Sequence, residues 1–342
     1  MQHQIWLGAL VVLGSALFNG SFLLPMKWAR AWRWENTWFL FSLMYLLVFP
    51  LFLAAAFVPH GAEVYRNVPV RELLTPLMFG LLFGVSLVTF GLSASSIGVV
   101  IAYAVGLGLN SVCGSLIPLL VLDPEALLRR QGILILVSLA LLLLGLFLYA
   151  VAGRRREREG NERAGRVAGN RLGIGLALAV VSGVFGASLN LGFAFSGDII
   201  QSSRQLGAGT VASTYAVWVL VLTGAFVPNL AYCVYLLCKN HAWRLFPEAG
   251  WSREVVLALA MSLAAIVAVC GYGVGATLLG KYGTSIGFAL FMGSTIFASN
   301  GFGILTGEWK RTSTMTRGIL AVGMATVVVS VIVLNVGAIF MH

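Results

Sequence analysis

The feature that most constrains this chain is a series of long apolar runs, each long enough to cross a bilayer as a helix. About 20 apolar residues at 1.5 Å per residue span the ~30 Å hydrocarbon core. The runs leave a sequence that is 59% hydrophobic and only 10% charged, which cannot cover a water-facing surface. We therefore expect an all-α integral membrane protein with ten transmembrane helices. The expected helices are Ile5–Trp28, Thr37–Val58, Leu73–Ser95, Ile97–Leu122, Gly132–Ala152, Leu172–Gly197, Ala208–Cys238, Val255–Leu279, Thr284–Thr306 and Met315–Met341.

Lysine and arginine are distributed unevenly between the connections, and this bias predicts the orientation of the chain. All but six of the 22 basic residues follow odd-numbered helices; the six are Arg66, Arg71, Arg129, Arg130, Arg204 and Lys281. Basic connections stay in the cytoplasm. We expect a multi-pass protein of the cell inner membrane with both termini outside. The leading MQHQ carries no cation, so the first helix is expected to stay in place and not to be a cleaved signal peptide.

The first connection, PMKWARAWRWENTW, combines three cations with four tryptophans. Lys27, Arg30 and Arg33 are expected to hold it in the cytoplasm. Its indole rings are expected to anchor the chain at headgroup depth, and they belong to Trp28, Trp32, Trp34 and Trp38.

The sequence divides into two five-helix halves, 1–152 and 172–342, joined by a polar, arginine-rich cytoplasmic linker at 153–171. Gly84–Gly98 and Gly273–Gly287 share six residues at a constant offset, and Val11–Ser21 more weakly matches Val180–Asn190. Because each half has an odd number of spans, the second half enters the membrane from the side opposite to the first. We expect two inverted repeats, the architecture of alternating-access transporters.

A polar side chain at mid-depth must face another helix or a wet cavity, so such residues are candidates for a substrate site. Asparagine offers donors and acceptors to hydroxyl groups, and an aromatic ring can cover the C–H face of a sugar. Each of these side chains could instead only hydrogen-bond a neighbouring helix, and Trp218 could face lipid. Asn110 and Asn300 occupy nearly corresponding places in the two halves. The full set is Asn19, Tyr103, Asn110, Asn190, Tyr215, Trp218, Tyr272 and Asn300.

No charged residue falls in the middle of an expected span, which disfavours a proton-driven exporter of cationic drugs. Carboxylates at helix ends could relay a proton if the cavity reaches them, or could simply be solvated. Glu35 and Glu308 lie on the expected cytoplasmic side, and Asp198 lies on the outer side.

Several other functions are disfavoured. The four cysteines lack ligand spacing and are expected to be buried, so we predict neither a metal site nor a cofactor. Scattered arginines argue against a nucleic-acid partner. The histidines, at termini or in loops, form no catalytic grouping, so an enzyme is not expected. A membrane sensor acting through the linker, and a facilitator or exchanger of another small metabolite, stay open as alternatives. Oligomeric state is left open.

The chain resembles the L-rhamnose/proton symporter family of the drug/metabolite transporter superfamily over essentially its whole length. Pro25, Lys27 and the W-x-W-E-x-x-W pattern of 32–38 carry the most specific likeness. Further pieces are Phe90–Gly98, then Gly106, Gly114 and Pro118, and then GILTGEW at Gly303–Trp309. The resemblance implies ten helices, an inverted repeat and import of L-rhamnose or a related neutral deoxyhexose with protons. It also implies that Glu35, and less directly Glu308, matter beyond topology. The linker and Ser196–Thr210 look less like the family pattern.

Overall fold

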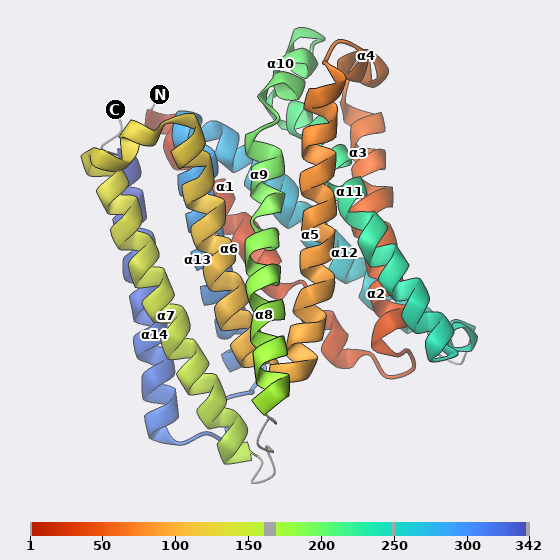
Figure 1. The fold of residues 1–342 in the computed structure, drawn as a ribbon, viewed down its shortest axis with the longest axis vertical. Coiled ribbons are helices and arrows are strands. Elements are labelled where there is room, and N and C mark those ends of the chain that lie inside the picture. Colours follow the sequence, from red (N-terminus) through yellow and green to blue (C-terminus); the bar gives the residue numbers. More distant parts are fainter. Residues whose placement is uncertain (1, 161–168, 248–249, 340–342) are drawn as a thin grey trace.

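The computed structural model describes residues 2–160, 169–247 and 250–339, and over these residues the chain is all-helical (Figure 1). The long helices are α1 (Gln2–Ser21), α2 (Trp34–Leu43), α3 (Phe49–Phe57), α5 (Val70–Ile97), α6 (Val99–Leu122), α7 (Arg130–Gly160), α8 (Gly169–Gly186), α11 (Thr210–Lys239), α12 (Trp251–Leu278), α13 (Gly283–Leu305) and α14 (Thr314–Ile339). Shorter pieces are η1 (Leu24–Trp28), η2 (Met44–Val48), α4 (Gly61–Arg66), η3 (Pro124–Leu128), α9 (Ser188–Ala194), α10 (Gly197–Gln205), η4 (Ala242–Leu245) and η5 (Gly280–Tyr282).

Ten segments are long and apolar enough to cross a membrane, which confirms the expected number of spans and a multi-pass membrane protein. Two expected helix ends were wrong. The fifth helix continues past Ala152 to Gly160, because the arginines and glutamates there are good helix formers. The sixth span does not stop at Gly197 but continues through α10 to Gln205. The expected helix end at Met341 and the linker residues 161–168 lie outside the described residues.

Two prolines shape the first two spans. Pro25 has no N–H group to continue α1, and the chain passes into the 3-10 turn η1. Pro50 likewise leaves the carbonyl of Leu46 without its usual helical donor, and the backbone widens into the π turn η2 between α2 and α3.

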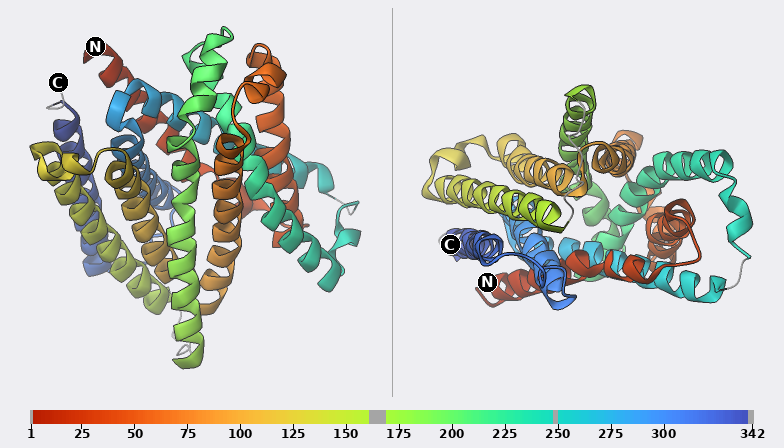
Figure 2. Two further views of the ribbon diagram at one scale, coloured as in Figure 1. Left: turned by 45° about the horizontal axis from the view of Figure 1, so that its top comes forward. Right: turned by 90° about the horizontal axis from the view of Figure 1, so that it is seen from below.

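The helices of the two halves pack against each other reciprocally. The first helix of the chain, α1, packs on α12 and α13, and α8, which opens the second half, packs on α5 and α6. Further pairs cross between the halves, among them α5 with α11, α6 with α13, and α7 with α14 at one edge of the bundle (Figures 1 and 2). α1 begins and α14 ends at the same end of the bundle.

The junctions between the third and fourth helices of each half lie at opposite ends of the bundle (Figure 1). Gly98 makes the first junction with φ +87°, a conformation that favours glycine. Its sequence match, Gly287, lies inside α13, and the second junction turns instead at Gly280, with φ +79°. The glycines of the matched segments therefore do not all occupy equivalent places in the two halves.

Small residues allow close contacts between helices, as expected from the many glycines. A Cβ on Gly80 of α5 would lie 2.1 Å from the carbonyl oxygen of Val221, and one on Gly224 of α11 would lie 2.3 Å from that of Leu77. Serine hydroxyls also pair across the halves. Ser138 of α7 donates to the carbonyl of Ser330 at 3.0 Å, and Ser330 donates back at 2.8 Å.

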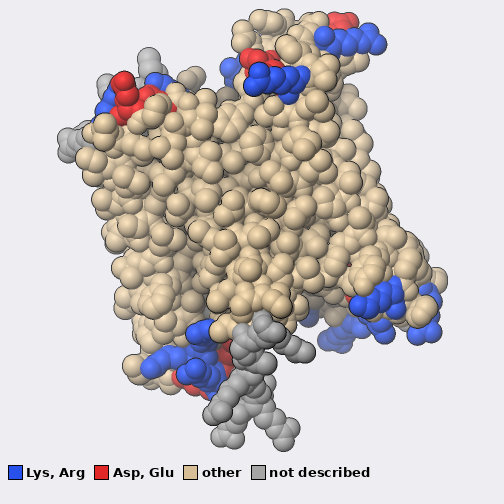
Figure 3. Space-filling model, viewed as in Figure 1, with Lys and Arg blue, Asp and Glu red and all other residues tan. Residues whose placement is uncertain are grey.

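Charged side chains gather at the two ends of the helices and leave an apolar band between them (Figure 3). We call the end of the bundle at which α7 and α11 end the basic end; it lies at the bottom of Figure 1. Arg156 and Lys239 lie at these two helix ends. Among the described residues, every lysine, arginine, aspartate and glutamate lies toward an end of its span or between spans.

Candidate functional site

A cavity lies between α6, α7 and α13, near the basic end. Its volume is ≈ 170 Å³. Tyr103 and Asn300 of the predicted site line it from α6 and α13, and Glu308 lies at its edge. The remaining lining residues include Leu107, Leu146, Tyr149, Arg156, Ile296, Ser299 and Trp309. The walls are thus largely apolar, with a few hydroxyl and amide groups and one ionic cluster.

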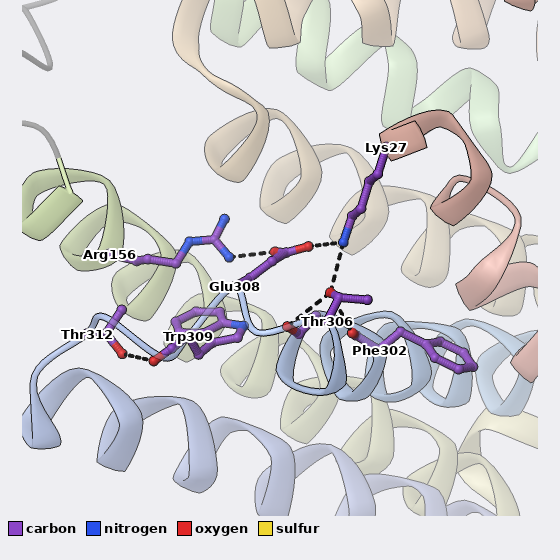
Figure 4. Close-up of polar contacts among 8 residues, drawn as sticks. Lys27, Arg156, Phe302, Thr306, Glu308, Trp309 and Thr312 are labelled. Atoms are coloured by element: carbon purple, nitrogen blue, oxygen red, sulfur yellow. Dashed lines mark hydrogen bonds and ion pairs between the residues drawn. The ribbon is translucent and has the colours of Figure 1, made fainter. Parts of the chain in front are cut away.

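That ionic cluster closes around Glu308, in the turn that follows α13 (Figure 4). Lys27 donates to Glu308 Oε1 from the turn after α1, and Arg156 Nη1 donates to Oε2 at 2.7 Å from the end of α7. Lys27 also donates to Thr306 Oγ1 at 3.1 Å. The Arg156 guanidinium lies over the buried Trp309 ring, 4.7 Å from its centroid. The cluster therefore joins both halves at the mouth of the cavity.

Two opposing effects set the pKa of Glu308. Partial burial raises it, but the hydrogen bonds and charges of Lys27 and Arg156 outweigh burial and hold the pKa below the ordinary glutamate value. In this conformation Glu308 is ionised at neutral pH, and a proton could stay on it only if a cation moved away.

Asn110 and Asn19 lie against α13 beyond the cavity. Asn110 is one turn along α6 from Leu107, which lines the cavity, and its Nδ2 approaches the sulfur of Met292 at 4.0 Å. Its Oδ1 is buried with no hydrogen-bond partner among the described residues. Asn19 Nδ2 donates to Thr295 Oγ1 at 3.2 Å. Asn300 Nδ2 donates to the carbonyl of Ile296 at 2.9 Å, a bond within its own helix.

Three other predicted residues form a separate, fully buried cluster. Tyr272 donates its hydroxyl to Asn190 Oδ1, while Asn190 Nδ2 donates to the carbonyls of Gly114 at 2.6 Å and Thr284 at 2.9 Å. Trp218 is 1% exposed and stacks on Phe193 at 4.8 Å, so it does not face lipid. The cluster fills the bundle where α9, α11, α12 and α13 meet.

Tyr215 and Asp198 lie apart from both groups. Tyr215 packs edge-on against Phe57 at 6.1 Å, near the end opposite the basic end. Asp198 is exposed in the first turn of α10. The structure does not bring either residue to the cavity.

The first connection binds the turn between α11 and α12. Glu35 is 6% exposed and accepts a hydrogen bond from Asn240 Nδ2 at 2.8 Å, so it is not the solvated carboxylate considered as an alternative. Glu254 is 1% exposed, and its Oε1 accepts the backbone N–H groups of Arg30 at 2.8 Å and Ala31 at 3.0 Å. The carboxylate of Glu254 thereby fixes the shape of the first connection.

The four tryptophans of the first connection differ in exposure and in their contacts. Trp28 and Trp34 are exposed, at 50% and 36%. Trp32 is buried and donates to the Leu245 carbonyl at 3.0 Å, and Trp38 donates to Asn229 Oδ1 at 3.3 Å. Two of the four indoles thus bond the second half, and the exposed rings of Trp28 and Trp34 are the ones free to anchor the chain at headgroup depth.

A second ionic contact lies at the opposite end of the bundle. Asp123, at the end of α6, accepts from Lys281 Nζ at 2.6 Å and from the Tyr282 hydroxyl at 2.8 Å. These hydrogen bonds lower the pKa of Asp123. Carboxylate–lysine contacts therefore join the two halves at both ends of the bundle.

Over the described residues, no group of three or more histidine, cysteine, aspartate or glutamate side chains is placed to hold a metal ion. The four cysteines are free thiols. The expectation that all are buried was wrong for Cys238, which is exposed at the end of α11, and for Cys113, which is half-buried.

The profile of one protein family, described as L-rhamnose-proton symport protein (RhaT), matches residues 1–341. The chain belongs to the L-rhamnose-proton symport protein family. This is a family of transport proteins and not of enzymes. Relatives named L-rhamnose-proton symporter align over nearly their full length. The protein of Cronobacter sakazakii is 23% identical, and that of Klebsiella pneumoniae is 20% identical; each alignment covers 98% of this chain and 99% of the relative. A Salmonella gallinarum relative is 21% identical with the same coverage.

Sequence reasoning missed several residues that the structure places in or beside the cavity and the first connection. They are Lys27 and Arg156 as partners of Glu308, Tyr149 in the cavity wall, and Glu254 and Asn240 under the first connection. The basic residues had been interpreted only as orientation signals. Tyr149 lies near the end of the expected helix Gly132–Ala152, outside the mid-span positions from which the candidate site was drawn.

Proposed function

We propose that this protein imports a neutral monosaccharide, L-rhamnose or a related deoxyhexose, together with protons across the inner membrane. The full-length family match and the names of the relatives support a sugar and a proton as cargo. The observation that carries the proposal is the cavity itself, where Tyr103 and Asn300 share one space with the ion-paired Glu308. Hydroxyl-binding and proton-binding groups are thus adjacent.

The reciprocal packing supports two inverted five-helix repeats, with alternating access as the transport cycle. α1 and α8 contact equivalent helices of the opposite half, and equivalent junctions lie at opposite ends. Each half also contributes to both ionic contacts, Glu308 with Lys27 and Asp123 with Lys281. We propose that these contacts break in turn as the two ends open, with the basic end in the cytoplasm and both termini outside.

The position of Glu308 between two cations supports proton coupling through this carboxylate. When Lys27 and Arg156 contact the carboxylate, it holds a negative charge and gives up its proton toward the cytoplasm. When the halves rearrange and both Lys27 and Arg156 move away, the remaining burial favours the protonated form. Glu35 is a second candidate, because its only side-chain hydrogen-bond donor among the described residues is the neutral Asn240 amide.

The alternatives predict different transport results. A facilitator or exchanger would move the same cargo without response to a proton gradient, and a sensor would not move it at all. The test is uptake of labelled L-rhamnose into proteoliposomes with and without an imposed pH gradient. We expect saturable uptake that accumulates only with an inward proton gradient. Saturable uptake that ignores the gradient would overturn the coupling, and entry of another sugar alone would overturn the choice of cargo.

A further inference from the structure

Tyr149 carries a buried hydroxyl group that the protein leaves without a partner. The residue lies on α7 and is 8% exposed, and its hydroxyl oxygen makes no hydrogen bond to any described residue. Buried hydroxyl groups in folded proteins are nearly always hydrogen-bonded, because leaving one unpaired is unfavourable. An unpaired hydroxyl on an otherwise well-packed ring indicates that its partner is a molecule that comes and goes.

The position of Tyr149 indicates where such a molecule would bind. Tyr149 lines the cavity together with Leu146, Ala150 and Gly153, which lie on the same face of α7, and with Tyr103 and Asn300 from two other helices. The other side of its ring is held by α14, since a Cβ on Gly323 would lie 3.3 Å from Tyr149 Cδ1. The ring is therefore packed against α14 on one side and borders the cavity on the other, and the hydroxyl oxygen is covered in this conformation, so a sugar reaches it when the cavity wall shifts.

No other unpaired polar atom in the described part of the chain both belongs to a residue that lines the cavity and lies too far from its own backbone to bond it. The hydroxyls of Thr37, Ser42, Ser115, Ser203 and Thr223 are on short side chains that can rotate toward their own helix carbonyls. Asn110 and Trp218 do not line the cavity. A tyrosine hydroxyl is too far from its own backbone to be satisfied in this way.

We propose that the Tyr149 hydroxyl is a direct hydrogen-bonding ligand of one ring hydroxyl of the transported sugar. Both groups can donate and accept, so a neutral polyol satisfies the hydroxyl without introducing a charge into the apolar part of the cavity. The inference rests on the proposed sugar transport and adds a contact from α7 that recognises a single hydroxyl position.

The test compares the wild type with Tyr149→Phe in proteoliposomes, using L-rhamnose and analogues that each lack one ring hydroxyl. We expect Tyr149→Phe to raise KM for L-rhamnose about three- to tenfold, the effect of one neutral hydrogen bond. The analogue that lacks the hydroxyl bound by Tyr149 should have the same KM in the wild type and in the variant, because neither can form that hydrogen bond. Tyr215→Phe, distant from the cavity, is the matched control and should leave KM unchanged.

Thermal unfolding in detergent without sugar separates recognition from a structural role. Removing an unpaired hydroxyl should leave the Tm of Tyr149→Phe at or above that of the wild type. A wild-type KM in the variant, an equal loss for every analogue, or a clear fall in Tm would each overturn the inference while leaving sugar transport intact. A wild type that transports no neutral monosaccharide would overturn both.

Discussion

Arg156 Nη1 lies 2.7 Å from Glu308 Oε2, and this contact ties the end of α7 in the first half to the turn after α13 in the second. Lys27 binds the other oxygen of the same carboxylate. One glutamate thus holds three segments together at the mouth of the cavity. A neutral carboxyl group binds two cations far less strongly than a carboxylate, so protonation of Glu308 would weaken these contacts.

Lys27→Gln should shift the pH dependence of uptake toward higher internal pH. Lys27 lowers the pKa of Glu308, so the contact is fully present at neutral pH and is lost as pH falls through that pKa. Removing the lysine raises the pKa and makes proton release harder. Uptake measured against internal pH checks this. Lys310→Gln, a nearby cation without an ion pair among the described residues, is the control. An unshifted profile for Lys27→Gln would count against coupling through Glu308.

Glu35→Gln should weaken proton-driven accumulation more than downhill sugar exchange. The glutamine keeps the size of the side chain and can still accept from Asn240, but it cannot bind and release a proton. Both rates are measured in the same proteoliposome preparation. Equal losses in the two assays would assign Glu35 a structural role in holding the first connection.

Glu254→Ala should lower the free energy of unfolding by about 1–3 kcal/mol, because the N–H groups of Arg30 and Ala31 lose their acceptor. Glu254→Gln retains an acceptor oxygen and should lower the free energy of unfolding much less. Thermal unfolding in detergent distinguishes the two variants. If both are equally unstable, the carboxylate charge itself, and not its backbone contacts, stabilises the site.

Gly80→Ala should destabilise the α5–α11 contact by about 1–3 kcal/mol, the range for overpacking a tight interface. The new methyl group would lie 2.1 Å from the carbonyl oxygen of Val221. Gly14→Ala is the matched control, because nothing lies within 4 Å of its Cβ position. A Gly80→Ala protein as stable as the control would show that these helices separate easily.

The number of spans could be predicted from the sequence because apolar runs and charged connections are local properties. The types of residue in the cavity could also be predicted, and Tyr103, Asn300 and Glu308 do share it. The sequence does not predict which of the candidate residues lie together in the cavity, because that depends on how each helix is rotated in the bundle. Tyr215 and Asn190 fit the same sequence criteria as Asn300 yet lie elsewhere.

Long-range contacts account for most of the remaining differences. Glu254 was placed just outside its helix, and nothing near it in the sequence indicates that Arg30 and Ala31 bury it. Trp32 lies in a basic, tryptophan-rich segment typical of membrane anchors, but its partner is the carbonyl of Leu245. Such pairings are set by the way the two halves meet.

The most direct test of sugar occupying this cavity is protection of a cysteine placed in its wall. Ser299→Cys is a near-isosteric change in a lining residue, introduced with Cys238→Ser to remove the exposed native thiol. A membrane-impermeant thiol reagent should label it from the cytoplasmic face, in inside-out vesicles, and L-rhamnose should slow that labelling in proportion to its occupancy. Labelling at the same rate with and without a sugar that the protein transports would contradict the account.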